Sequence, residues 1–139
     1  MGGINYRIIG ITTFNFDGLN AYAVSEIALA KNLDMMGARA AILSVRVHDV
    51  NISAGSSGSK IEVILKPELP CPEDPSKEFV GSTIATAMLT SGTVADSLVQ
   101  AGTSAEFGPV GRVVLKATQG ATGAMALNCK ISFELCLKD

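Results

Sequence analysis

Tryptophan is absent from the chain, and aromatic residues make up only 5% of its 139 positions. Sugar-binding surfaces usually offer exposed aromatic rings, so this scarcity disfavours a lectin. The chain has one histidine and three cysteines, and these do not follow the spacing of a closed zinc site. We therefore expect no metal and no cofactor.

Charge is also scarce, because charged residues make up 17% of the chain, compared with about 25% in an ordinary soluble domain. The 11 basic and 13 acidic residues leave a net charge of -2. Direct contact with a nucleic acid requires clustered lysine and arginine, since neutralising phosphates releases counterions. The composition predicts no direct nucleic-acid partner.

Long apolar runs are missing, because charged or polar residues interrupt each candidate before the roughly 20 consecutive apolar residues of a membrane helix. The first residues contain no basic segment followed by an apolar run, so we expect no secretory signal. We expect no membrane partner and a protein made in the cytoplasm, where Cys71, Cys129 and Cys136 stay free thiols.

What the chain has in excess is apolar character, with 47% hydrophobic residues and a mean hydropathy of +0.35. Its length fits a single domain covering residues 1–139. A domain of this size has limited core volume, so part of the apolar excess is expected on surfaces that neighbouring subunits cover. The composition favours self-association.

The clearest structural signal is strict alternation of apolar and other residues over Met125–Leu137. Period two is typical of a strand with one face in a core. Val113–Gln119 predicts another strand, and Gly120–Gly123 supplies the glycines of a turn. We therefore predict a long antiparallel hairpin at the end of the chain.

Further strands are predicted in the first half of the chain. Tyr6–Phe16 is apolar on both faces, and Asp17-Gly18 ends it with a turn. Ala41–Ile52 alternates, but its phase changes near His48, which predicts a β-bulge there. Ser53–Ser59 is expected to be a loop, and Ile61–Lys66 a return strand that completes a second hairpin.

Three stretches have helical features. Ala21–Met36 is rich in good helix formers and is followed by Gly37, so a helix is the plainer interpretation, although alternation at its start leaves a strand open. Thr93–Ala101 predicts a two-turn helix with a capping threonine. Phe79–Thr90 fits either state, and its threonine and serine content favours a strand.

Prolines punctuate residues 67–78, at Pro67, Pro70, Pro72 and Pro75. Each removes a backbone donor and fixes its own φ, so we expect no ladder pairing through this segment. It is interpreted as an extended surface connection or, alternatively, as a semi-rigid arm that lies on a neighbouring subunit.

Catalytic chemistry has little support. His48 adjoins Asp49, but neighbouring strand residues point to opposite faces, so a hydrogen bond at the surface or at an interface is the expected role of His48. Cys129 falls on the apolar register and Cys136 on the other. No nucleophile elbow, phosphate-binding loop or dinucleotide fingerprint occurs. We expect no catalytic residues and no enzyme.

These signals predict a mainly β fold, an antiparallel β-sandwich or jelly-roll-like domain with one or two short helices. The alternative is an α+β arrangement with a helix packed on an antiparallel sheet. The predicted function is that of a structural subunit in a self-assembling particle, as a virus or phage capsid, decoration, tail or filament component. A small-ligand or glycan-binding β module, or an enzyme with a site shared between subunits, are the alternatives.

Subunit contacts are expected on the polar face of the last strand, on the proline segment and near the N-terminus. The predicted interface residues are Tyr6, Pro70, Pro72, Asn128, Lys130, Ser132 and Glu134.

Overall fold

The computed structural model describes residues 3–35, 37–70, 73–74, 76–104 and 108–138, with the side chains of all of these except 3–11, 70 and 78. Each regular element in these ranges is a β-strand. In chain order the strands are β1 (Gly3–Asn15), β2 (Val24–Asp34), β3 (Ala40–Ile52), β4 (Lys60–Pro70), β5 (Glu78–Val80), β6 (Ala85–Leu89), β7 (Ser97–Thr103), β8 (Val110–Thr118) and β9 (Leu127–Lys138).

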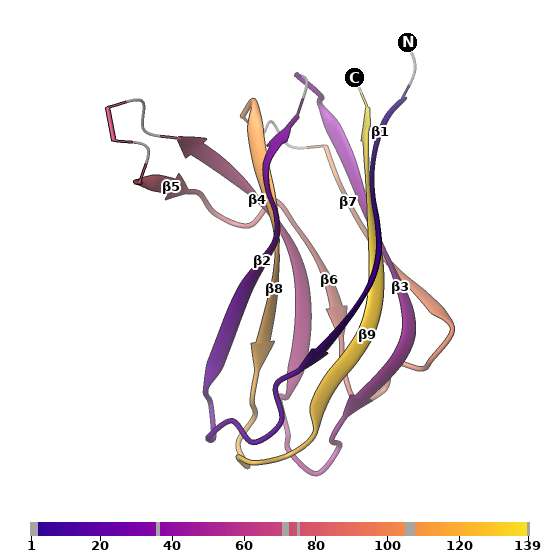
Figure 1. Ribbon diagram of the computed structural model, residues 1–139. Helices are drawn as coiled ribbons and strands as arrows, with labels where there is room; N and C mark the ends of the chain where they lie inside the picture. Colours follow the sequence, from indigo (N-terminus) through magenta and orange to yellow (C-terminus); the bar gives the residue numbers. More distant parts are fainter. Residues whose placement is uncertain (1–2, 36, 71–72, 75, 105–107, 139) are drawn as a thin grey trace.

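The strands form two antiparallel sheets that face each other (Figure 1). One sheet has the order β1-β9-β3-β7. The other has the order β2-β8-β4, and the remaining edge of β4 pairs with β6 along one part and with β5 along another. With β5 set aside, each strand lies in the opposite sheet from the next except at β4 and β6, which is the strand order of a jelly roll. The predicted β-sandwich is confirmed.

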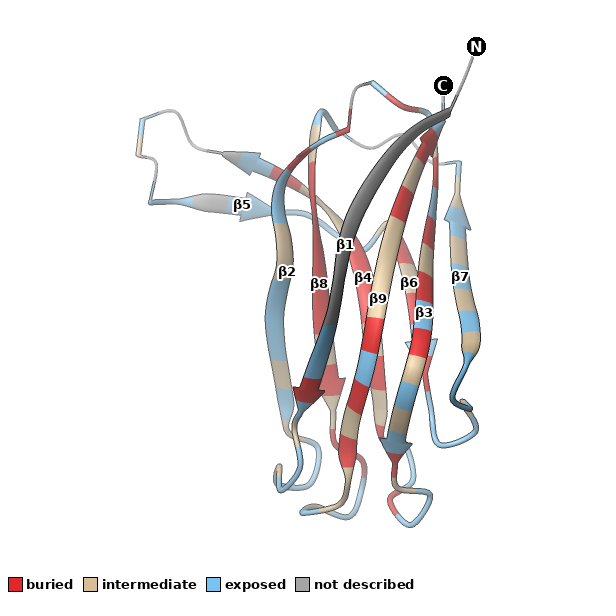
Figure 2. Ribbon diagram, turned by 45° about the vertical axis from the view of Figure 1, so that its right-hand side comes forward, coloured by how far each residue is buried: buried red, intermediate tan, exposed pale blue. Residues whose placement is uncertain are grey.

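The core lies between the two sheets and is built from alternate residues of the central strands. Its fully buried side chains include Leu43, Val45, Ile61, Val63, Leu65, Leu115, Leu135 and Leu137. Figure 2 shows the buried positions alternating with half-buried and exposed ones along β9 and β3. Burying one such aliphatic side chain contributes about 1.5–3 kcal/mol, so this shared interior holds the sheets together.

The strand predicted over Met125–Leu137 is confirmed as β9, with its odd-numbered apolar residues facing the core. The predicted hairpin with the preceding strand is wrong, because β8 pairs with β2 and β4 while β9 pairs with β1 and β3. The hairpin predicted between β3 and β4 is wrong for the same reason. Alternation indicates which face of a strand is buried. It does not indicate whether two strands pair within one sheet or face each other across the core from opposite sheets.

The loops that cross between the sheets at one end are joined by polar contacts. Ser53–Ser59 is a loop, as predicted, yet Ser56 and Ser59 are buried in it. The buried Gln119 side chain donates through Nε2 to Ser59 Oγ at 3.0 Å and to Ser56 Oγ at 3.3 Å. Gly120 lies against the backbone of Ser57 so closely that a side chain would not fit.

Both predicted helices are wrong. Most of Ala21–Met36 is strand β2, because hydrogen bonding to β8 outweighs the helix propensity of its alanine, leucine and lysine residues. In Thr93–Ala101 the threonine Oγ1 accepts from the backbone of Thr90 and closes a turn instead of capping a helix. Asp96 then adopts a left-handed φ of 58°, and β7 begins at the next residue. Phe79–Thr90 includes the end of β5 and all of β6, so the strand structure favoured there is confirmed.

Of two further predictions about strand pairing, one is confirmed and one is wrong. The bulge predicted near His48 is confirmed by a register shift between Val47 and Asp49. The expected lack of pairing from residue 67 is wrong, because β4 continues to Pro70 and the Pro67 carbonyl accepts from the Gly81 amide at 2.9 Å. Proline removes only a donor, so its carbonyl still pairs at a sheet edge.

Candidate interaction surfaces

The end of β4 leaves the sandwich and pairs with β5 as a hairpin that projects from the body of the molecule (Figure 1). We call Glu68–Pro70 with Glu78–Val80 the projecting hairpin. The pairing of β4 with β8 ends at Pro67. Beyond this residue, β4 pairs with β5. The hairpin is therefore covered by few other elements of its own chain.

The projecting hairpin exposes large apolar side chains. Leu69 and Phe79 are directly paired across its strands and are 60% and 58% exposed. Val80, on the other face, is 42% exposed. Directly opposite residues of antiparallel strands share a face, so Leu69 and Phe79 form one continuous apolar pair in water.

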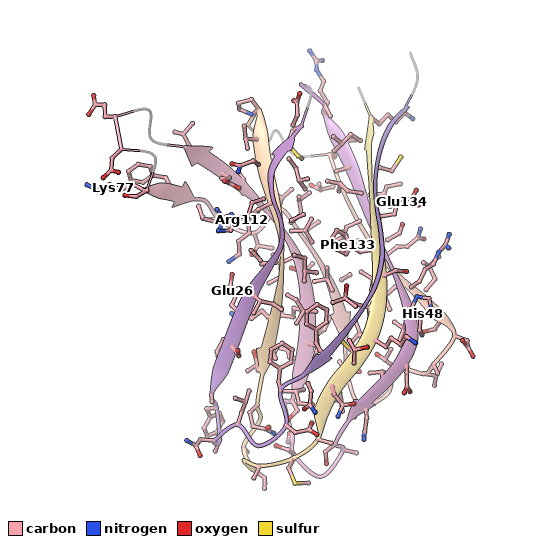
Figure 3. The ribbon with its side chains drawn as sticks, in the orientation of Figure 1. Glu26, His48, Lys77, Arg112, Phe133 and Glu134 are labelled. Carbon is pink, nitrogen blue, oxygen red and sulfur yellow. The ribbon has the colours of Figure 1, made fainter. Side chains whose placement is uncertain are left out.

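A buried ion pair fixes the base of the projecting hairpin. Glu68 Oε2 accepts from Arg112 Nε at 3.1 Å and from the Asn32 backbone amide at 3.3 Å, which ties β4 to β8 and β2. Glu68 is 3% and Arg112 is 8% exposed. Figure 3 shows Arg112 at the base of the hairpin and Lys77 at its outer end. Separating this pair would leave a buried charge, so the pair resists displacement of Glu68 from β8 and β2.

The outer turn of the hairpin has its own hydrogen bonds. Asp74 Oδ1 accepts from the Ser76 amide at 3.1 Å and from Ser76 Oγ at 2.6 Å, and its carbonyl accepts from the Lys77 amide at 2.9 Å. An aspartate that bonds the backbone two residues on is a common way to close a turn. Polar contacts therefore occur toward both ends of the hairpin, and the exposed Leu69–Phe79 pair lies between them.

The predicted β9 residues lie together on the outer face of the first sheet. Asn128 Nδ2 donates to Asp17 Oδ1 at 3.0 Å, and Ser132 Oγ lies 3.0 Å from His48 Nε2. Lys130 is exposed, and Glu134 is half-buried. This face is polar and partly bonded within its own sheet.

The other predicted interface residues do not complete that surface. Tyr6 pairs with Leu135 in the same sheet, through the register of β1 with β9. Pro70 belongs to the projecting hairpin in the other sheet, and Pro72 lies outside the described residues. The prediction therefore spans two surfaces. It did not include Leu69, which lies within the proline-rich segment, or Phe79, which follows it.

The side chains considered for catalysis or metal binding do not form a common site. His48 bonds Ser132, whereas Asp49 Oδ1 accepts from the adjacent Val50 amide at 2.9 Å, so the two side chains do not form a dyad. Burial raises the pKa of the Cys129 thiol to about 12, which keeps it neutral. Within the described ranges no group of three metal-ligating side chains occurs.

One open depression of about 470 Å³ lies between the β3–β4 loop and the turn after β6. Its lining is serine-rich, with Lys60 and Met88 as the larger side chains, and includes no aromatic ring. The exposed aromatic side chains that the structure describes are Tyr22 and Phe79, on different elements. They do not form a sugar-stacking platform.

No protein-family model and no curated protein matches the chain. Among solved structures it is similar to a disulfide-linked pilus of Bacillus endospore appendages, with 12% identity and a TM-score of 0.41, over 98% of this chain and 88% of that one. It is similar to PirA at 8% identity and a TM-score of 0.39, over 92% and 96%.

A third similar structure is a carbohydrate-binding module of the β-sandwich superfamily, with 9% identity and a TM-score of 0.46. The match covers 94% of this chain and 55% of that one. These likenesses are weak, and the strand order above establishes the fold without them. Within the described part of the chain, no helix is long and apolar enough to span a membrane.

Proposed function

We propose that the protein is a structural subunit of a self-assembling particle and that the projecting hairpin is its contact with another copy. The observation that carries the proposal is the exposed Leu69–Phe79 pair on a hairpin whose base is fixed by the buried Glu68–Arg112 ion pair. Exposed apolar groups of this kind mark protein contacts. A contact element whose base is fixed by a buried ion pair loses less conformational entropy on binding than a free segment does.

The second copy offers a matching apolar surface at the opposite end of the same sheet. Tyr22 is 72% and Val24 is 53% exposed, and we call these two residues the β2 patch. Val24 pairs with Thr118, whereas the hairpin leaves the sheet beside Gly111 at the other end of β8. Contact between different surfaces of two copies is head-to-tail, which produces rings or filaments.

Such a subunit suits a virus or phage capsid, a decoration layer, a tail or a filament. The low basic content favours a position without direct contact to nucleic acid. The proposal includes no catalytic activity, and His48→Ala is expected to leave assembly unchanged.

The test is complementation between two blocked variants. Phe79→Ser blocks the hairpin, and Tyr22→Ser blocks the β2 patch. Each variant alone is expected to remain no larger than a dimer in sedimentation velocity. An equimolar mixture is expected to form larger species than either variant alone, because its two partners together restore the contact between the hairpin and the β2 patch.

Val94→Ser is the matched control, because Val94 is 65% exposed and lies in neither surface. It is expected to assemble like the unmodified chain. Assembly by Phe79→Ser at the level of the control would contradict the hairpin contact. A monomeric unmodified chain that instead binds an oligosaccharide would favour the glycan-binding alternative.

A further inference from the structure

Strand β7 ends the first sheet, and β3 is its only hydrogen-bonded partner among the described strands, although β6 at the edge of the other sheet lies close to it. Figure 2 shows β7 as the outermost strand on the right. Its seven residues pair with β3 without a register break, from Ala41↔Thr103 to Val47↔Ser97. It contains no charged residue and no proline. A regular, uncharged edge is a template for another strand.

The other edge strands are protected in ways that β7 is not. Strand β2 carries Glu26, Lys31 and Asp34 and has two register breaks against β8. Strand β1 carries Arg7 and has a register break against β9. Strand β6 is uncharged but has only five residues. Charges, bulges and short length are the usual means of preventing edge pairing.

Gly102 in β7 has no explanation within its own chain. It is not among the residues with positive φ, and it pairs regularly with Ile42. A Cβ built there would meet only ordinary contacts, at 3.8 Å from the Ala41 carbonyl oxygen and 3.9 Å from Ile42 Cγ1. Glycine inside a strand costs roughly 0.5–1 kcal/mol relative to alanine and often marks a close approach by another group.

We propose that β7 pairs antiparallel with β7 of a second copy, about a two-fold axis at Gln100. Gln100 is the middle residue of β7, so this register uses the full strand and places Gln100 opposite its own copy. It also places Leu98 opposite Gly102. Both residues lie on the outer face, as does Ile42 beside Gly102, and Leu98 and Ile42 are 55% and 47% exposed.

In this pairing the Leu98 side chain of each copy fills the space over Gly102 of the other and covers its Ile42. The exposed apolar side chains and the glycine are then accounted for by one contact. Strand pairing of this size buries little surface, so by itself it is expected to give a weak dimer that forms at high concentration, and other contacts in an assembly strengthen it. The inference therefore rests on the proposed self-assembly, but it uses a different surface from the hairpin and the β2 patch.

Charge reversal at the two-fold axis tests the pairing. Gln100→Glu and Gln100→Lys each place two like charges opposite each other, and each is expected to weaken dimerisation at least about tenfold. An equimolar mixture pairs opposite charges and is expected to recover the dimer. Both variants are compared in a Phe79→Ser background, which removes the hairpin contact and isolates the β7 dimer.

A cysteine scan tests the register. In a chain with Cys71 and Cys136 changed to serine, Gln100→Cys is expected to form a disulfide between copies, because directly opposite residues lie within disulfide reach. Leu98→Cys is the matched control and is expected to stay unlinked, since two such residues lie several residues apart across the axis.

The outcomes separate the two proposals. Association that is unchanged by both charge variants, in a chain that assembles, overturns the β7 pairing and leaves the hairpin contact standing. A dimer that is sensitive to residue 100, in a chain that forms nothing larger, supports the β7 pairing and overturns the particle. A chain that remains a monomer overturns both.

Discussion

The two parts of β4 differ in how much of their apolar side chains other strands cover. From Lys60 to Leu65 the strand lies between β8 and β6, and Ile61, Val63 and Leu65 are fully buried. From Glu68 the same strand leaves the sandwich, and Leu69 is mostly exposed although it follows Leu65 by four residues. Both positions are leucine, and they differ in whether other strands cover the side chain.

This contrast shows where the apolar excess of the chain is placed. Some of the apolar side chains fill the space between the sheets. Others are exposed on the projecting hairpin, on the β2 patch and along β7. The Glu68–Arg112 ion pair lies at the boundary on β4 and ties the start of the projecting part to β8. Variants on the core side of this boundary should therefore lower the stability of the fold, whereas variants on the hairpin side should affect self-association.

The largest effect is expected at Leu65. Leu65→Ala leaves a cavity in a fully buried site, so the free energy of unfolding should fall by about 3 kcal/mol in chemical denaturation. Leu69→Ala is the matched control on the same strand, and its change should stay within about 0.5 kcal/mol. Equal losses at the two positions would show that the two parts of β4 do not differ as described.

The next effect is expected at the boundary. Glu68→Ala leaves the Arg112 guanidinium without its buried partner and should lower the free energy of unfolding by about 2 kcal/mol. Replacing both partners, with Glu68→Leu and Arg112→Met, should recover most of the loss, because no unpaired buried charge remains. A double variant no more stable than Glu68→Ala would contradict the ion-pair explanation.

A similar contrast between interior and exterior exists on β9, where Cys129 is buried and Cys136 is half-buried. Burial raises the pKa of the Cys129 thiol from 9.0 to about 12. Above pH 9 the unfolded chain loses this proton while the folded chain keeps it, so stability should fall as pH rises, by about 1 kcal/mol per pH unit. Urea unfolding from pH 8 to pH 11 measures the slope, and Cys129→Val should reduce it.

The smallest effect on stability is expected at the end of the hairpin. Phe79→Ser changes a residue that packs little against its own chain, so the unfolding free energy measured at low concentration should change by less than about 0.5 kcal/mol. Thermal unfolding of the variant beside the unmodified chain gives this value. A loss of 2 kcal/mol or so would mean that Phe79 stabilises the fold, and its exposure would then not argue for a contact.

Sequence patterns predicted much of the fold because strand alternation is a local property. Met125–Leu137 alternates strictly and is β9, and the phase change near His48 is a bulge. The partners of these strands were not predicted, since alternation does not tell a hairpin from a crossing between sheets. Ala21–Met36 failed because its helix formers are good local candidates, whereas pairing with β8 is decided by distant residues.

The candidate surfaces were predicted less well than the strands. Asn128, Lys130 and Ser132 share one face because strand geometry requires it, yet two of them are bonded within the sheet. The exposure of Leu69 and Phe79 depends on where β4 leaves β8, which no local pattern encodes. The role proposed for Gly102 and Leu98 depends on β7 being an edge strand, which the sequence alone does not show.

Sedimentation velocity of the unmodified chain over about two orders of magnitude in concentration measures self-association. We expect a sedimentation coefficient that rises with concentration beyond that of a dimer, with ordered particles or filaments visible by electron microscopy at the upper end. A single monomeric species throughout would contradict it.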